Sequence, residues 1–159
     1  MRVGVADTTF ARVDMAAVAV ETLRKAHDSD DGLEIERSTV PGMKDLPVAA
    51  KKLIEEQQCE IVLAFGWVGK EEIDEQCAHE ASTGLITAEL MTNTHILKVF
   101  VHEREAGDEE KLQAIARDRA AKHALNALAL LKGKEELTAL AGKGRRQGGE
   151  DAGALWKHT

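Results

Sequence analysis

The chain has 159 residues, a formal net charge of −7 and a sequence pI near 5.4, which argues against general nucleic-acid binding because such proteins usually carry a basic surface. The length suits one domain, and the two cysteines form neither a CxxC motif nor a disulfide framework, a pattern typical of a reducing compartment. The sequence has no signal-peptide pattern and no apolar run of the about 18 residues that a membrane span needs, so we expect a cytoplasmic protein.

Short apolar strands alternate with helical segments along the chain. Continuous or alternating apolar runs predict the strands, and apolar residues three and four positions apart predict the helices. Asp14 is the expected N-cap of the first helix, and the sequence SDDG at 29–32 predicts a break. The predicted strands are 2–6, 33–40, 60–66 and 95–101, and the predicted helices are 15–27, 46–58, 74–91, 108–132 and a short one near 134–141.

This alternation predicts a small three-layer α/β/α fold, in which helices cover both faces of a four-stranded parallel sheet. We expect one domain over residues 1–141, followed by a Gly-rich basic tail over 142–159. Doubly wound sheets bind ligands at the carboxyl ends of their strands, where the strand-to-helix loops gather. The loops that concern function are therefore 7–14, 41–46, 66–73 and 102–107.

The first of these loops, DTTFAR, places Phe10 beside hydroxyl and charged side chains. An aromatic ring just past a strand end either packs on the core or lies at the rim of a site, where it suits stacking on a planar heterocycle. Thr9 and Arg12 are candidate binding residues because they share this loop with Phe10.

The second loop, VPGMKDLP, contains both prolines of the chain. Pro41 ends the strand because it cannot donate to the sheet ladder, and Gly42 permits either a positive φ or the close approach of a ligand to the backbone. Asp45 is the expected N-cap of the next helix, and Pro47 then falls in its first turn. A tight strand-to-helix turn explains each of these residues, and the free N–H groups at the helix start also suit a ligand.

Three further features of the sequence are open to more than one interpretation. The third loop, GWVGKEE, lacks the spacing of a Walker phosphate loop. A helix-surface or interface role is the favoured interpretation of His79, whereas His102 lies at the carboxyl end of the last predicted strand. The Gly-rich segment 142–148 follows a helix instead of a strand, so it is not a dinucleotide loop. It is either a solvated tail or an arm that docks on a neighbouring subunit or covers a site.

Four motifs in this order resemble the lumazine synthase family: Phe10 after the first strand, VPGMKDLPVAA, GWVG and AHEASTGL at 78–85. The resemblance covers roughly residues 1–130. Between Trp67 and Cys77, however, lumazine synthases carry a Gly-Thr pair that binds phosphate and a nearby acid/base histidine. Here this segment reads VGKEEIDEQ, so a phosphorylated four-carbon sugar would meet carboxylates, which is unfavourable.

The motifs VADTTFARVDM, TVPGMKDLP, CAHEAS, LMTN and AGKGRRQG resemble the archaeal-type riboflavin synthase family, a relative of the lumazine synthases. This resemblance implies transfer of a four-carbon unit between two molecules of 6,7-dimethyl-8-ribityllumazine, giving riboflavin and 5-amino-6-ribitylaminouracil. It also implies a homopentamer with sites between subunits and a requirement for Mg²⁺. Two alternatives stay open, a lumazine synthase with a rebuilt third loop and a non-catalytic flavin- or lumazine-binding protein.

The resemblance also implies a set of substrate-binding residues. Phe10 is expected to stack on the ring system, Phe100 to approach it from the adjacent subunit, and Asp45 to bind the ribityl hydroxyls. The other implicated positions contribute backbone groups along the ribityl chain (Gly42, Met43 and Lys44) or border the pyrimidine edge (Trp67, Val68 and Gly69).

Candidates for proton transfer come from position alone, because the acid/base histidine of lumazine synthases has no counterpart in this sequence. They are His79, His102 and Glu103. No residue can be named as a metal ligand. The substrate itself supplies much of the reactivity, since the C7 methyl group of the lumazine is unusually acidic. The protein must mainly hold two heterocycles in a productive pose.

Overall fold

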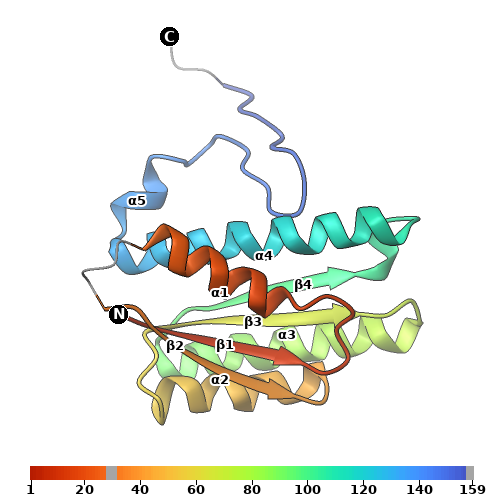
Figure 1. Ribbon diagram of the computed structural model, residues 1–159, viewed down its shortest axis with the longest axis horizontal. Helices are drawn as coiled ribbons and strands as arrows, with labels where there is room; N and C mark the ends of the chain where they lie inside the picture. The colour runs from red at the N-terminus through yellow and green to blue at the C-terminus, as the bar shows by residue number, and fades with distance from the viewer. Residues whose placement is uncertain (28–31, 157–159) are drawn as a thin grey trace.

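The computed structural model describes residues 1–27 and 32–156, which form the expected three-layer α/β/α fold (Figure 1). Within these residues, one parallel sheet runs in the order β2-β1-β3-β4. The strands are β1 (Arg2–Thr8), β2 (Glu34–Val40), β3 (Ile61–Val68) and β4 (Ile96–His102). The helices are α1 (Met15–Ala26), α2 (Leu46–Glu55), α3 (Glu72–Thr92), α4 (Glu109–Lys132) and α5 (Glu135–Thr138), with 3-10 turns η1 (Met43–Asp45) and η2 (Glu103–Glu105). None of these helices is long and apolar enough to cross a membrane.

The sheet carries an apolar core on each face because side chains alternate along its strands. Val5 and Phe65 pack with α1 and α4, whereas Ala6 and Ala64 pack with α2 and α3. The central strand β3 is buried along its whole length, as its nearly continuous apolar sequence predicts. Figure 1 shows one pair of helices above the sheet and the other below, with all four strand ends pointing to the right.

Several element ends differ from the sequence-based prediction. β3 continues to Val68, because Trp67 and Val68 pair with Val101 and His102 of β4, so the prediction of these two residues in a loop is wrong. Two other strands also end later than predicted, β1 by two residues and β4 by one residue. α3 begins at Glu72, where a capping box satisfies the helix start. The predicted break at 29–32 lies largely outside the described residues.

The start of α1 agrees with its predicted cap. The Asp14 side chain accepts a hydrogen bond of 2.9 Å from the backbone N–H of Ala17. The start of α2 agrees only in part. Asp45 occupies the N-cap position, but its side chain makes no capping hydrogen bond, because η1 already turns the chain there and the Asp45 N–H donates to the carbonyl of Gly42.

The turn that contains both prolines packs against α3. Gly42 has φ −144° and ψ 168°, so it is extended, and of the two alternatives the positive φ is excluded. Open space lies beside its Cα, which leaves the alternative of close approach by a ligand. Pro47 is in the first turn of α2, and its ring packs against Gly84 of α3. The turn is therefore fixed to α3 as well as to its own strand.

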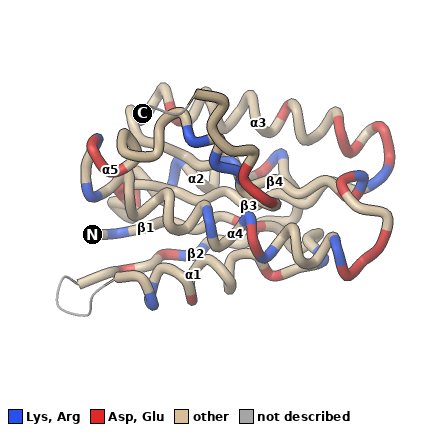
Figure 2. The backbone as a smooth tube through the Cα atoms, turned by 90° about the horizontal axis from the view of Figure 1, so that it is seen from above, with Lys and Arg blue, Asp and Glu red and all other residues tan. Residues whose placement is uncertain are grey.

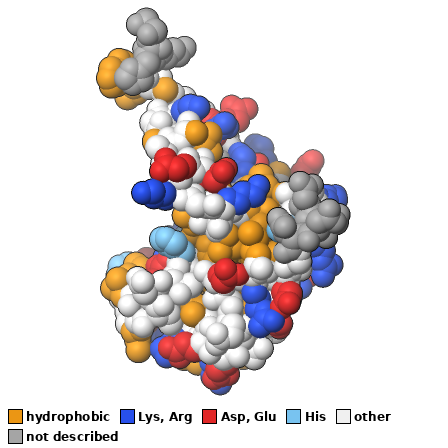
Figure 3. Space-filling view, turned by 90° about the vertical axis from the view of Figure 1, so that its left-hand side faces the viewer, with side chains coloured by type: hydrophobic (Ala, Val, Ile, Leu, Met, Phe, Trp, Pro, Cys, Tyr) orange, Lys and Arg blue, Asp and Glu red, His pale blue; other side chains and the backbone are white. Residues whose placement is uncertain are grey.

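A hollow of about 610 Å³ lies between α4 and the tail that follows it. Figure 3, which views the end where the strands begin, shows apolar side chains gathered beneath the projecting tail. His123 of α4 borders this hollow, and its Nδ1 has no hydrogen-bond partner in the part of the chain that the structure describes. Burial, and to a smaller extent the charge of Arg119, lowers the pKa of His123 to about 4.

The stability of the fold is expected to depend on pH through His123. Between pH 6.5 and about 4 the unfolded chain binds a proton here that the folded chain does not, so stability falls as pH falls through this window. His123→Leu is expected to remove this part of the decline. Thermal unfolding of both proteins at pH 7 and pH 5 measures it. Equal losses of Tm on acidification in the two proteins would contradict the prediction.

Candidate functional site

The loops that follow the four strands meet at one end of the sheet, as expected for a parallel doubly wound fold. This end is also rich in acidic side chains, which Figure 2 shows gathered on the right, at the starts of α3 and α4. The first turn of α3 contains Glu72, Asp74 and Glu75, and the first turn of α4 contains Glu109 and Glu110. A dianionic phosphate group would be repelled by such a rim.

The first loop is tied to the second and presents an exposed aromatic ring. The Thr9 N–H donates to the carbonyl of Val40 over 2.9 Å, and the Thr9 hydroxyl donates to the carbonyl of Pro41 over 3.3 Å. The Phe10 ring lies beside Gly69 at the end of β3 and is 54% exposed. This exposure excludes the core-packing interpretation of Phe10 and leaves the rim aromatic.

The second loop offers both charge and open backbone. Lys44 forms an ion pair of 3.0 Å with Glu80 of α3, and the hydrogen bond in this pair lowers the pKa of the Glu80 carboxyl. Met43 is buried, so it presents no exposed side chain in this loop. Asp45 is exposed, and its carboxylate has no partner within the described ranges. It is thus available to accept hydrogen bonds from a ligand.

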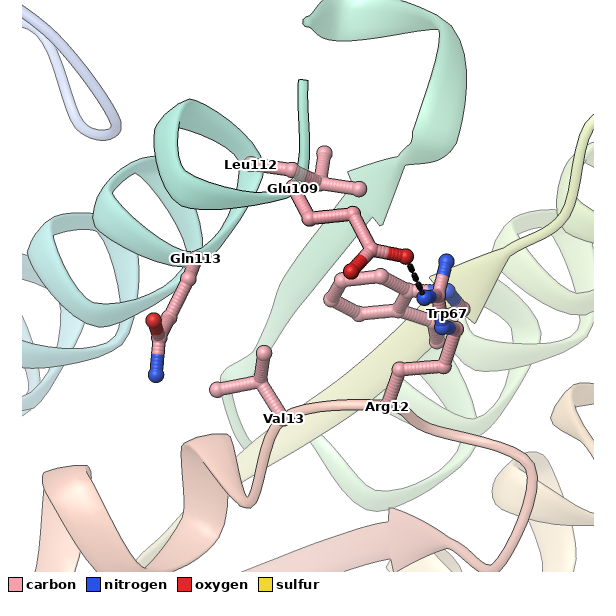
Figure 4. A pocket seen from close by; sticks show the side chains of 6 residues that line it. All are labelled: Arg12, Val13, Trp67, Glu109, Leu112 and Gln113. Carbon is pink, nitrogen blue, oxygen red and sulfur yellow. Dashed lines mark hydrogen bonds and ion pairs between the residues drawn. The ribbon is translucent and has the colours of Figure 1, made fainter.

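Trp67 lies on the opposite face of the sheet from the second loop. Its side chain is 1% exposed and packs in the core with α1 and α4. Its indole Nε1 donates a hydrogen bond of 2.9 Å to Glu103. In Figure 4, Arg12 pairs with Glu109 beside the indole, at the mouth of a cavity of about 150 Å³. Val68 faces α2 and α3 and is also buried. Trp67 and Val68 thus present no exposed side chain at this edge.

His102 and Glu103 are neighbours in sequence but point to opposite faces of the sheet. The Nδ1 atom of His102 lies 2.9 Å from a carboxylate oxygen of Glu75 in α3. Glu103 instead accepts from Trp67 and, over 3.2 Å, from Arg12 of the first loop. The hydrogen bond from Trp67, followed by Arg12, lowers the pKa of Glu103 although burial opposes this. Glu103 is therefore a carboxylate at neutral pH, and it is buried beside Trp67 on the α1 and α4 face of the sheet.

Phe100 lies on the same face as His102, where its ring covers Gly66 of β3. A Cβ atom at position 66 would lie 2.6 Å from the ring, so the flat contact requires glycine there. Phe100 retains partial exposure. The rings of Phe10 and Phe100 therefore both border the end of β3, with the His102–Glu75 pair on the α3 side.

His79 lies on the exposed surface of α3, four residues beyond Glu75 and hence on a neighbouring stretch of the same helical face. This agrees with the favoured helix-surface interpretation. The sequence reasoning missed the partners Glu75 and Glu80. Glu75 lies in the acidic segment before the AHEAS motif and Glu80 lies within that motif, and these positions could have indicated them.

The predicted Mg²⁺ has no evident protein site. Among the described residues, no group of three or more His, Cys, Asp or Glu side chains is arranged to hold a metal ion. Mg²⁺ in proteins is usually held by only one or two carboxylates with water and substrate, so we derive no step of the reaction through a cation.

Comparison with known proteins gives consistent results. Residues 1–135 match the 6,7-dimethyl-8-ribityllumazine synthase family. Riboflavin synthase of Methanothermobacter thermautotrophicus is 57% identical over 155 residues, which cover 98% of this chain and 99% of the relative. Riboflavin synthase of Aeropyrum pernix is 52% identical over 154 residues, 96% and 97% of the two chains. Riboflavin synthase of Archaeoglobus fulgidus is 46% identical over 157 residues, 99% and 100% of the two chains.

Proposed function

We propose that this chain, which belongs to the 6,7-dimethyl-8-ribityllumazine synthase family, is a riboflavin synthase. It transfers a four-carbon unit between two molecules of 6,7-dimethyl-8-ribityllumazine and yields riboflavin and 5-amino-6-ribitylaminouracil. The observation that carries this proposal is the similarity to riboflavin synthases over nearly the full length of both chains, at 46–57% identity. The residues after 135, which include the tail, lie outside the family match but almost entirely within the aligned span of these relatives.

The acidic start of α3 favours this activity over lumazine synthesis. Lumazine synthesis needs a phosphorylated four-carbon sugar, whereas the dismutation uses a substrate without phosphate. Glu72, Asp74 and Glu75 stand in the segment where lumazine synthases bind that phosphate. Their charge would repel a phosphate group and leave a neutral ribityl chain unaffected.

The proposed chemistry needs orientation more than a strong nucleophile. Two lumazine rings must lie face to face, and alignment of this kind supplies much of the barrier reduction for a bimolecular step. Phe10, together with Phe100 of the adjacent subunit, provides apolar faces for the rings, and Asp45 with the open backbone at Gly42 accepts and donates along the ribityl chain. His102, oriented by Glu75, is the proposed proton-transfer group because it is partly exposed on this face.

A homopentamer with sites between subunits is part of the proposal. Exposed apolar side chains on α3 support an interface there, since Ile86, Leu90 and Met91 are 48%, 80% and 66% exposed. An adjacent subunit would cover these side chains and bring its Phe100 to the site. Native mass spectrometry measures the subunit number directly.

The Mg²⁺ requirement and a cytoplasmic location are also proposals, supported by the family resemblance and by the cysteine pattern. Assay of EDTA-treated protein, before and after addition of Mg²⁺, tests the ion requirement. Identical rates in the two assays would reject it.

Incubation of the protein with excess 6,7-dimethyl-8-ribityllumazine alone tests the proposed activity. Riboflavin fluorescence is expected to rise over many turnovers, with one riboflavin formed for each two lumazines consumed. A lumazine synthase would form no riboflavin from this substrate. A binding protein would change the fluorescence stoichiometrically and then stop. Either result would reject the proposal.

Asp45→Asn separates the binding role of this residue from its helix-start role. Asparagine is as good as aspartate at an N-cap position, so stability is expected to stay within about 0.5 kcal/mol. Loss of a charge-assisted hydrogen bond to the ribityl chain is expected to raise KM about tenfold, equivalent to about 1.5 kcal/mol. Steady-state kinetics and thermal unfolding measure both effects. An unchanged KM would remove Asp45 from the site.

A further inference from the structure

Arg119 of α4 joins three segments that are distant in sequence. Its Nη1 donates to the carbonyl of Phe100 in the edge strand β4 over 2.9 Å. Its two terminal nitrogens each donate over 2.7 Å to a different carboxylate oxygen of Glu105. Its Nε donates over 3.3 Å to the carbonyl of Gln147 in the C-terminal tail. The Arg119 side chain is 16% exposed, so these contacts are largely shielded from solvent.

Glu105 connects Arg119 to the backbone of His102 in the candidate site. One of its oxygens, besides pairing with Arg119, accepts a hydrogen bond of 2.9 Å from the backbone N–H of His102. Burial opposes ionisation of Glu105, but the hydrogen bonds from Arg119 and from His102 outweigh it and lower the pKa of its carboxyl. The backbone on both sides of Val101 is thus held by the Arg119–Glu105 fork, and His102 is held with it.

The C-terminal tail also contacts Arg119 and its neighbours on α4. Figure 1 shows it turning down onto α4 and away again. The Gly148 N–H donates over 2.8 Å to Asp118, and Lys122 donates over 2.8 Å to the carbonyl of Gly149. Gly148 has φ +89°, and a Cβ atom built there would lie 2.5 Å from Nη2 and 2.7 Å from Cζ of Arg119. Glycine is required because the tail backbone lies directly on the guanidinium group.

We propose that Arg119 is a positioning residue for the riboflavin synthase reaction, and that the tail locks its guanidinium in place through Gly148. The proposed role of Arg119 requires no contact with the substrate. It acts through Glu105 on the backbone of His102 and so on the orientation of that imidazole. This inference rests on the proposed function. It assigns the Gly-rich segment a role as a clamp on the β4 end within its own chain.

Gly148→Ala is the sharpest test, and Gly149→Ala is its matched control. A Cβ atom at Gly149 meets only Arg146, at an ordinary contact distance of 3.5 Å. We expect Gly148→Ala to lower kcat between about tenfold and a hundredfold, with KM within about twofold, because a displaced proton-transfer group affects the chemical step and leaves the ring-binding surfaces intact. Gly149→Ala is expected to behave as wild type. Rates are expressed per folded site, counted by stoichiometric lumazine binding.

A second variant tests the same contact from its other side. Arg119→Lys keeps the charge but cannot form the fork, so we expect a similar loss of kcat. Adding Gly148→Ala to Arg119→Lys is expected to cause little further loss, because both changes break one arrangement. The proposal would be overturned if the losses of kcat in the double variant were fully multiplicative, or if Gly148→Ala had the kcat of wild type. It would also be overturned if both alanine variants lost kcat equally, or if the loss were confined to KM or to the folded fraction.

Hydrogen exchange gives a readout that does not depend on activity. The amide of His102 is expected to exchange faster in Gly148→Ala than in Gly149→Ala, measured on peptides that span 100–106. Unchanged exchange would overturn the clamp even if activity fell. Wild-type protein that forms no riboflavin while this exchange difference is present would instead reject the proposed function.

Discussion

Replacing Phe10 by alanine is expected to lower kcat/KM between about 5-fold and 150-fold, equivalent to about 1–3 kcal/mol of lost stacking and apolar contact. The ring is 54% exposed in the isolated chain and contributes little to the core, so the folded protein should keep its stability. Steady-state kinetics and thermal unfolding measured on the same preparations check both halves of this expectation.

Phe10→Leu is the matched control for this prediction. Leucine keeps most of the apolar area but lacks a flat aromatic face, so a loss close to that of Phe10→Ala would indicate stacking on the heterocycle. Activity near wild type in Phe10→Leu would indicate apolar contact alone. Unchanged kcat/KM in Phe10→Ala would remove Phe10 from the site.

Replacing Trp67 by alanine is expected to have the largest effect on stability, a loss of about 3–5 kcal/mol. The indole is buried between β3, α1 and α4, and its removal leaves both a cavity and a Glu103 carboxylate without its closest donor. Urea unfolding at a fixed protein concentration measures the change, since assembly also affects apparent stability. A loss below about 1 kcal/mol would contradict the packing described for Trp67.

Trp67→Phe isolates the hydrogen bond to Glu103 from the packing. It keeps a ring in the core and is expected to lose about 1–3 kcal/mol at neutral pH. Because the indole lowers the pKa of Glu103 below its ordinary value of 4.5, the stabilisation is present above that value and is lost as pH falls through the lowered one. The difference between wild type and Trp67→Phe is therefore expected to shrink on acidification. A difference that stays constant down to pH 3 would contradict this cause.

The sequence was sufficient for the fold because its apolar pattern and its loops agree. Four strands alternate with helices, and this order leaves few topologies for a parallel sheet. The errors lie at element ends. The carboxyl end of β3 was placed at residue 66 because GWVG reads as a loop, yet Trp67 and Val68 are held in the sheet by pairing with β4, a long-range contact that no local pattern reports.

The same error explains what could not be predicted of the site. Side chains alternate between the faces of a strand, so the face that a residue occupies depends on where the strand ends. With β3 extended, Trp67 faces α1 and α4, and with β4 extended, His102 and Glu103 point to opposite faces. Three residues that the sequence grouped at one edge are thus divided between two sides of the sheet.

Phe10 and Asp45 illustrate the opposite case. The prediction for each residue follows directly from its position in a loop after a strand. In the structure both side chains are exposed at the expected end of the sheet. The contacts of Arg119, in contrast, join α4, β4, η2 and the tail. From the sequence alone Arg119 is indistinguishable from an ordinary helix-surface arginine, because these contacts form only in the folded chain.

The contact between Gly66 and the Phe100 ring has a consequence for how this site can change. With a Cβ only 2.6 Å from the ring, any larger residue at 66 displaces the aromatic, while a smaller residue at 100 uncovers the backbone of β3. The two positions are therefore epistatic. Mutant libraries that vary one of them at a time will discard combinations that work only as pairs, so altered substrate selectivity should be sought by randomising both positions together.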